Sequence, residues 1–150
     1  MSQLASIQSF LEPREMAISG VSRNPKKFGR MVYDQLKEKG FKIYPVNPNT
    51  EMIDGETCYS DVSSLPEHVE RLYIVTPARE TTGVVEAAVA NGIKNIWIQQ
   101  KSENPEVVQI AEQNQVNLIH KECIFKYAEP VGGVHAFHRL LNKLFGSYPK

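Results

Sequence analysis

The chain has 150 residues, of which 41% are hydrophobic and 23% charged, and its 17 basic and 17 acidic residues give a formal net charge of zero. This length favours a single domain over residues 1–150 with a substantial core. The balanced charge argues against a general nucleic-acid binder, and no apolar run approaches the roughly 20 residues of a membrane span, so we expect neither nucleic acid nor membrane as a partner.

The amino-terminal residues and the cysteine content indicate the compartment of the protein. The first twelve residues lack the basic start and apolar stretch of a secretory signal. Only Cys58 and Cys123 are present, which predicts reduced thiols in the cytoplasm rather than a disulfide framework.

Hydrophobic periodicity predicts helices and strands that alternate along most of the chain. In order, we expect a helix over residues 6–11, a strand over 15–19, a helix over 29–39, a strand over 41–46, a turn with a short extended piece over 53–59, and a short helical connection over 61–68. The second half predicts a strand over 72–75, a helix over 80–91, a strand over 95–99, a helix over 105–114, a strand over 116–119, and a closing amphipathic helix over 135–145. Such alternation predicts an α/β fold, with a doubly wound parallel five-stranded sheet and helices on both faces.

The junction between the first strand and the next helix, residues 19–30, is the most informative segment. Gly20 permits a tight turn and a close approach of a ligand to the backbone. The following helix offers free N–H groups and the positive end of its dipole. Four basic side chains lie within eight residues: Arg23, Lys26, Lys27 and Arg30. The junction therefore predicts a polyphosphate site, although a solvated basic surface would also explain the charges.

Two common nucleotide motifs are missing at this junction. A dinucleotide fingerprint would show G-x-G-x-x-G after the first strand and an acid at the end of the second, but Gly20 is followed by Ser22 and the second strand ends at Asn47. The Walker pattern is absent as well. These absences count against a nicotinamide or P-loop nucleotide at this site.

A larger set of motifs resembles a known family. Its members are Ile18 to Pro25, Lys27-Phe28-Gly29, Lys39-Gly40, Tyr44 to Pro48, Gly55, Trp97-Ile98-Gln99 and Cys123. The series is similar to the small single-domain CoA-binding proteins, which are themselves similar to the amino-terminal domain of the succinyl-CoA synthetase alpha subunit. The resemblance covers roughly residues 10–130 and implies a Rossmann-like fold that binds coenzyme A.

The resemblance also implies which residues hold the diphosphate of CoA. They are Gly20, Val21, Ser22 and Arg23. Lys27 matches a basic position of the same loop and is expected to add positive charge. CoA carries a diphosphate and a 3′-phosphate, which can accept charge-assisted hydrogen bonds. Each such contact is expected to contribute on the order of 1.5–3 kcal/mol.

Two further loops are implied as parts of the site. Asn47 and Pro48 match the loop after the second strand, near the adenosine and its 3′-phosphate. Val75, Thr76 and Pro77 match the loop after the third strand. From the residues alone, an ordinary turn explains the first pair and a helix start explains the last.

Cys123 has a sharper and a blander interpretation. The resemblance implies a thiol near the end of the last strand that faces the CoA sulfur, where a mixed disulfide is conceivable. A small buried hydrophobe is the commoner role of a free cysteine. No metal site is expected, because His120 with Cys123, or His135 with His138, has no matching further ligands.

We favour a binding protein for CoA or an acyl-CoA that has no catalysis of its own, because no catalytic constellation is evident. The alternatives are a nucleotide- or acyl-CoA-dependent enzyme and an NAD(P)-binding regulatory subunit, since fold alone does not decide function. The sequence also allows a homo-oligomer, or an interaction subunit that docks on an unknown protein partner which supplies the chemistry.

Overall fold

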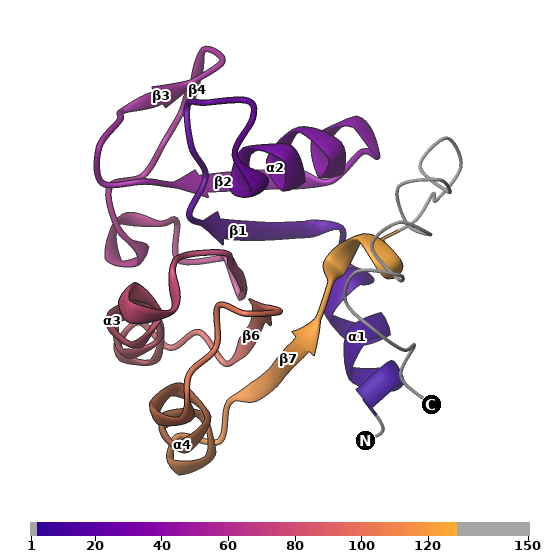
Figure 1. The fold of residues 1–150 in the computed structure, drawn as a ribbon, viewed down its shortest axis with the longest axis vertical. Coiled ribbons are helices and arrows are strands. Elements are labelled where there is room, and N and C mark those ends of the chain that lie inside the picture. The colour runs from indigo at the N-terminus through magenta and orange to yellow at the C-terminus, as the bar shows by residue number, and fades with distance from the viewer. Residues whose placement is uncertain (1–2, 129–150) are drawn as a thin grey trace.

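The computed structural model describes residues 3–128, and the helix predicted over residues 135–145 lies outside them. Its centre is a five-stranded sheet in the order β2-β1-β5-β6-β7, with every neighbouring pair parallel. The strands are β1 (Glu15–Ser19), β2 (Lys42–Val46), β5 (Arg71–Ile74), β6 (Asn95–Gln99) and β7 (Asn117–Glu122). In Figure 1, the labelled strands β2 and β1 lie next to each other above β6 and β7.

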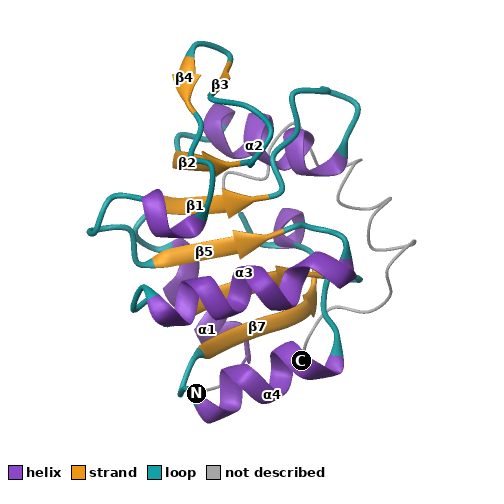
Figure 2. Cartoon of the chain, turned by 90° about the vertical axis from the view of Figure 1, so that its left-hand side faces the viewer, coloured by secondary structure: helices purple, strands orange, loops and turns teal. Residues whose placement is uncertain are grey.

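Helices cover both faces of the sheet. In the described residues they are α1 (Gln3–Leu11), α2 (Phe28–Glu38), α3 (Ala78–Ala90) and α4 (Pro105–Gln113). Side chains of α1 and α2, such as Phe10 and Leu36, share one buried cluster with Ile18 of β1, whereas Val85 of α3 shares the other cluster with Ala17. Figure 2 shows α3 and α4 in front of the sheet. Neighbouring residues of β1 thus point to opposite, equally buried faces, as a parallel sheet requires.

The strand order creates a switch point between β1 and β5. From β1 the chain passes through α2 to β2 on one side, and later returns to β5 on the other side of β1. Ser19 pairs with Ile74 and with Val46, so the three strands end at the same level. Loops that leave neighbouring carboxyl ends in opposite directions open a crevice, which is where doubly wound sheets bind ligands.

Small elements bridge β2 and β5. They are the antiparallel hairpin of β3 (Met52–Ile53) and β4 (Glu56–Thr57), and the 3-10 turn η1 (Val62–Ser64). Asp54 and Gly55 between the hairpin strands both have positive φ, which suits a tight hairpin turn. A second 3-10 turn, η2 (Ile124–Lys126), follows β7.

The predicted α/β fold, parallel and Rossmann-like with helices on both faces, is confirmed. The helical connection expected over 61–68 is wrong in length, because only Val62–Ser64 is helical and Pro66 interrupts any continuation. The last strand runs further than expected, to Glu122, because its polar end pairs with Gln99 of β6 across a bulge. The pattern of apolar residues in β7 does not predict this pairing, because the residues at its end are polar.

Candidate functional site

Two glycines bring the β1–α2 loop against the end of β5. Gly20 has a φ of +106°, and a Cβ built on it would lie 3.0 Å from the carbonyl carbon and oxygen of Val75. A Cβ on Gly29 would lie 2.1 Å from the carbonyl oxygen of Gly20. Only residues without a side chain fit both positions, so the β1–α2 loop packs closely against the backbone that follows β5.

Polar side chains of the loop itself set its shape. Ser22 Oγ accepts a hydrogen bond from the Asn24 N–H at 3.0 Å, and Asn24 Oδ1 accepts one from the Lys26 N–H at 3.0 Å. The N–H groups of Val21, Ser22 and Arg23 make no hydrogen bond within residues 3–128. Three neighbouring donors after a strand end suit an oxyanion.

Asn47 ties the loop after β2 to the β1–α2 loop. Its Nδ2 donates to the carbonyl oxygen of Val21 at 2.7 Å, and its Oδ1 accepts from the Asn49 N–H at 2.8 Å. Its own N–H donates to the carbonyl oxygen of Tyr59 at 2.9 Å. Through the Val21 contact, the side chain expected near an adenosine joins two loops, and Pro48 follows it at the surface.

Thr76 and Pro77 precede α3, with Pro77 as the cap residue before the first helical turn. The hydroxyls of Thr76 and Thr81 lie 2.8 Å apart, and both side chains are buried. This pair fixes the loop after β5 against the helix. Structurally, the segment is the helix start that the sequence also allowed.

Arg30 corrects one expectation about charge. The residue is 8% exposed, and its guanidinium donates to Asp34 at 2.9 Å, to Asp54, and to the carbonyl oxygen of Arg23 at 3.0 Å. The hydrogen bond to Asp34 is the main cause that raises the Arg30 pKa further. Its charge is therefore balanced inside the fold, and three of the four basic side chains of the junction remain exposed: Arg23, Lys26 and Lys27.

The same contacts anchor the β3–β4 hairpin on α2. Besides the Arg30–Asp54 pair, Lys37 Nζ lies 2.8 Å from Glu56 Oε1, and the Tyr33 hydroxyl donates to Glu56 Oε2 at 3.1 Å. The hydrogen bond from Lys37 lowers the pKa of Glu56 and raises that of Lys37. The hairpin is thereby positioned beside the β1–α2 loop.

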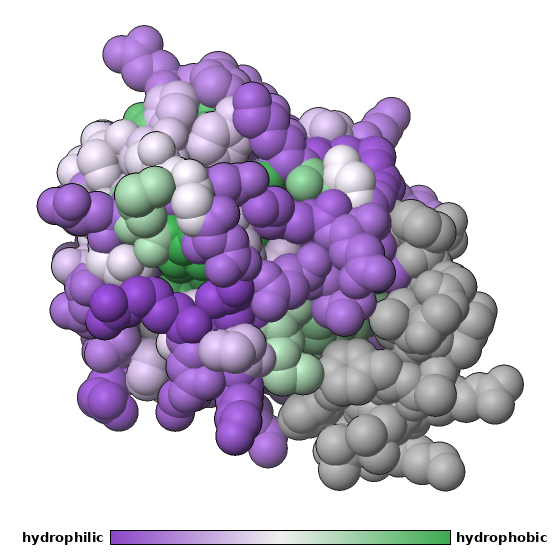
Figure 3. All heavy atoms as spheres, turned by 90° about the horizontal axis from the view of Figure 1, so that it is seen from above, coloured by the Kyte–Doolittle hydropathy of each residue, from purple (hydrophilic) through white to green (hydrophobic). Residues whose placement is uncertain are grey.

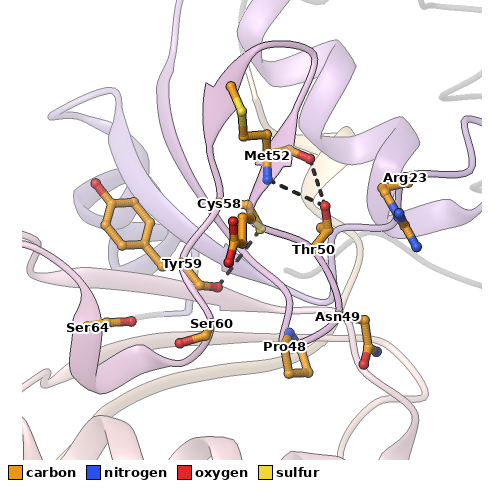
Figure 4. A pocket seen from close by; sticks show the side chains of 10 residues that line it. Arg23, Pro48, Asn49, Thr50, Met52, Cys58, Tyr59, Ser60 and Ser64 are labelled. Carbon is orange, nitrogen blue, oxygen red and sulfur yellow. Dashed lines mark hydrogen bonds between the residues drawn. The ribbon is translucent and has the colours of Figure 1, made fainter.

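A hollow of about 790 Å³, here called the hairpin cavity, lies between the hairpin and that loop. Its lining includes Arg23, Thr50, Met52, Cys58, Tyr59 and Ser64. Figure 4 shows Arg23 entering from the β1–α2 loop, across from Ser60 and Ser64. Its charged side chains are Arg23 and Glu51.

A second hollow, the sheet-edge cavity, has a volume of about 530 Å³ and lies at the switch point. It is bounded by the loops after β1, β2 and β5 and by one face of α3, and it shares Pro48, Asn49 and Ser60 with the hairpin cavity. Its charged side chains are Asp61 and Glu80. Asp61 accepts from the Ser63 hydroxyl, the main cause that lowers its pKa, and also from the Ser64 N–H. The surface seen in Figure 3 is mainly hydrophilic, with apolar atoms in a few small hollows.

The structure brings most of the predicted site residues together. The sheet-edge cavity is lined by Gly20, Val21, Ser22, Asn47, Pro48, Val75, Thr76 and Pro77. Arg23 lines the hairpin cavity, next to Pro48. Lys27 is exposed at the start of α2 and lines neither cavity.

Cys123 lies elsewhere in the fold. It is 0% exposed in the core beneath α1 and α2, and neither cavity includes it. Burial raises the pKa of its thiol, and hydrogen bonds with the Phe125 backbone and with the Gln99 side chain oppose that shift. Its surroundings are those of the buried small hydrophobe rather than of a reactive thiol.

Sequence reasoning missed several lining residues. Cys58 lies in the hairpin cavity, where burial raises the pKa of its thiol. Gly83, Val84 and Ala87 form part of the α3 wall of the sheet-edge cavity. Their signal was present in the sequence, because residues 80, 83, 84 and 87 share one helix face that begins after a strand at the switch point.

Residues 3–128 contain no group of three or more His, Cys, Asp or Glu side chains placed to hold a metal ion. In the same residues, no helix is both long and apolar enough to span a membrane.

The comparison with known proteins agrees with this geometry. The model of the CoA binding domain family matches residues 14–129. The chain belongs to the CoA-binding domain family. It is 31% identical over 147 residues to the alpha subunit of the ADP-forming acetate–CoA ligase II of Pyrococcus furiosus, which covers 91% of this chain but only 30% of that relative. The chain thus spans under a third of the length of this ligase subunit.

Smaller proteins match nearly along their whole length. The uncharacterized protein YneT of Bacillus subtilis is 24% identical over 121 residues, covering 80% of this chain and 90% of YneT. Among solved structures, a conserved hypothetical protein from Pyrococcus furiosus has a TM-score of 0.72 at 36% identity, with 74% of this chain and 96% of that one covered. A domain of this size therefore occurs both alone and within larger ligases.

Proposed function

We propose that the chain binds coenzyme A or an acyl-CoA at the switch point between β1 and β5. The observation that carries the proposal is the set of three unpaired N–H groups at Val21, Ser22 and Arg23, within residues 3–128, beside the crevice at the switch point. Membership in the CoA-binding domain family supports the same ligand.

The residues fit CoA in a specific arrangement. The N–H groups of residues 21–23 suit the diphosphate, since backbone donors at a loop before a helix stabilise anions. Arg23, on the rim of the hairpin cavity, suits the 3′-phosphate beside the adenosine. Lys27 contributes through its charge from outside both cavities. Bound CoA would supply its thiol or thioester, while this chain holds and orients it.

We propose that the described residues have no catalysis of their own. The linings of the two cavities contain neither histidine nor lysine, and their only thiol is that of Cys58, whose pKa is raised by burial. Chemistry on the bound thioester would then come from another chain or domain. Both cysteines are buried and unpaired, which suits a reducing cytoplasm.

A second candidate role follows from the match to a ligase alpha subunit over 91% of this chain. In that role the chain is the CoA-binding part of an acyl-CoA ligase assembled from separate chains. Co-purification with a tagged copy, followed by an assay for CoA-dependent acyl transfer in the captured complex, tests it. Recovery of the tagged chain alone, as a monomer or homo-oligomer, contradicts it.

Isothermal titration with CoA, acetyl-CoA, dephospho-CoA and NADP tests the main proposal. We expect CoA and acetyl-CoA to bind. Dephospho-CoA should bind more weakly, because it lacks the 3′-phosphate that would face Arg23. Arg23→Gln is expected to weaken CoA by about 10- to 100-fold, as a charge-assisted contact contributes on the order of 1.5–3 kcal/mol, and to remove the preference over dephospho-CoA.

Lys42→Gln is the matched control. It also removes one positive charge, from an exposed side chain at the opposite end of β2, and should leave CoA affinity unchanged. Absence of CoA binding by the wild-type chain, or tighter binding of NADP than of CoA, overturns the proposal.

A further inference from the structure

The guanidinium of Arg30 joins three separate segments of the chain. Its Nε donates to Asp34 of α2 at 2.9 Å, its Nη1 donates to the carbonyl oxygen of Arg23 at 3.0 Å, and its Nη2 donates to Asp54 in the β3–β4 turn. Each nitrogen therefore has a different acceptor. A lysine cannot reproduce this arrangement, because its three donors diverge from one nitrogen, whereas the guanidinium is a planar fork with fixed directions.

One of these acceptors belongs to the loop that carries the unpaired N–H groups. The carbonyl oxygen of Val21 accepts from the Asn47 side chain at 2.7 Å, and that of Arg23 accepts from Arg30. In a trans peptide the C=O and the N–H point in opposite directions, so a side chain that holds a carbonyl also orients the next N–H. Asn47 orients the N–H of Ser22 in this way, and Arg30 holds the peptide that follows Arg23.

Another acceptor, Asp54, belongs to the β3–β4 hairpin. Each of its strands has two residues, and a hairpin is marginally stable at best without further contacts. Ile53 anchors this hairpin in the core, where it is 2% exposed, and Arg30 holds the neighbouring Asp54. Met52 of the hairpin and Arg23 of the loop both line the hairpin cavity. The same guanidinium is therefore bonded to two walls of this cavity.

Arg30 itself lines neither cavity, and two carboxylates balance its charge. We propose that Arg30 is a positioning residue for the nucleotide end of CoA. It holds the backbone of Arg23 and the hairpin in one arrangement, so that the Arg23 side chain meets the 3′-phosphate across the hairpin cavity. This inference rests on the proposed function, because it requires CoA at this site.

Arg30→Lys tests the inference, because it keeps the positive charge and removes the fork. In calorimetry we expect CoA to bind about tenfold more weakly, and dephospho-CoA to lose less, so that the preference for CoA narrows. Arg14→Lys is the matched control. Arg14 donates to the carbonyl oxygen of Lys39 and lies over the Phe41 ring, outside both cavities, and its substitution should leave both affinities within about twofold of wild type.

Asp54→Asn and Asp34→Asn separate the hairpin from α2. Each variant removes one carboxylate from Arg30, and the two side chains are 60% and 43% exposed, so the fold should tolerate either change. Charge alone predicts that neither variant weakens CoA, because each loses negative charge near an anion site. Positioning predicts that CoA binds at least about threefold more weakly to Asp54→Asn than to Asp34→Asn.

Each other result overturns the inference in a recognisable way. Retained CoA affinity in Arg30→Lys would show that the charge is sufficient, and equal weakening of CoA and dephospho-CoA would show a general loss of stability. Equal affinities of Asp34→Asn and Asp54→Asn would exclude the hairpin as the positioned element. This pair also decides alone if circular dichroism shows that Arg30→Lys does not fold. A wild-type chain that binds no CoA contradicts the proposed function, and the inference with it.

Discussion

Two alanine substitutions in helices should change stability in opposite directions. Gly29→Ala places a methyl group where an ideal Cβ would be 2.1 Å from the Gly20 carbonyl oxygen, and Gly83→Ala places one where no atom lies within 4 Å. Neither glycine has positive φ, so backbone conformation does not separate them. The difference between the two variants isolates the close approach of α2 to the β1–α2 loop.

The magnitude follows from the contact. Carbon atoms pack best at about 3.5–4.0 Å, so the backbones at Gly29 and Gly20 must separate by an ångström or more. Neither partner is a flexible side chain that can rotate away. Overpacking of this kind costs about 1–3 kcal/mol, against a gain of about 0.5–1 kcal/mol from replacing glycine in a helix. We expect Gly29→Ala to lose about 1–2 kcal/mol and Gly83→Ala to gain about 0.4–1 kcal/mol.

Urea unfolding followed by circular dichroism measures both values, with the m-value as a check that the unfolded states are comparable. For a chain of this length, the melting temperature should fall by roughly 2–8 °C in Gly29→Ala. CoA affinity should fall as well, because the displaced residue Gly20 begins the loop that we propose to bind the diphosphate. A Gly29→Ala protein as stable as wild type would refute the close approach as the reason for this glycine.

The remaining predictions concern thiols, pH and a loop contact. Iodoacetamide at pH 8 should modify Cys58 and Cys123 slowly, because burial raises the pKa of both thiols. Mass spectrometry should show that CoA slows the modification of Cys58 alone. Equal protection of both thiols, or of neither, would contradict the placement of CoA in the hairpin cavity. Since Lys37 lowers the pKa of folded Glu56, this carboxylate stabilises the fold above its ordinary pKa and ceases to do so as pH falls through the lowered value. Glu56→Gln should therefore cost up to about 1 kcal/mol at pH 7 and nothing in strong acid, and a cost that is independent of pH would show that the ion pair is not its cause. Asn47→Ala should cost about 1–2 kcal/mol in urea unfolding, since it removes two loop hydrogen bonds; an unchanged midpoint would mean that these bonds do not hold the loops together.

Local patterns in the sequence were sufficient for the order of the elements in residues 3–128 and for the turn between β1 and α2. Helical spacing and short buried runs predicted the strands and helices near their observed bounds, because a parallel sheet buries both faces of each strand. Gly20 predicted a tight turn, and the basic residues after it predicted a binding site for an anion. All of these signals arise between residues that are close along the chain.

Contacts between distant residues decided the rest. Arg30 looked like one more cation, yet its guanidinium donates to Asp34 and to Asp54, which lies 24 residues later, and these carboxylates balance its charge. Cys123 seemed suited to the ligand, but the packing of α1, α2 and the sheet encloses it in the core. Cys58 drew no attention, and only the closeness of the β3–β4 hairpin to the β1–α2 loop makes it a lining residue. Burial and charge balance depend on which segments of the chain pack together. The hydrophobic periodicity of one segment does not show which distant segments contact it.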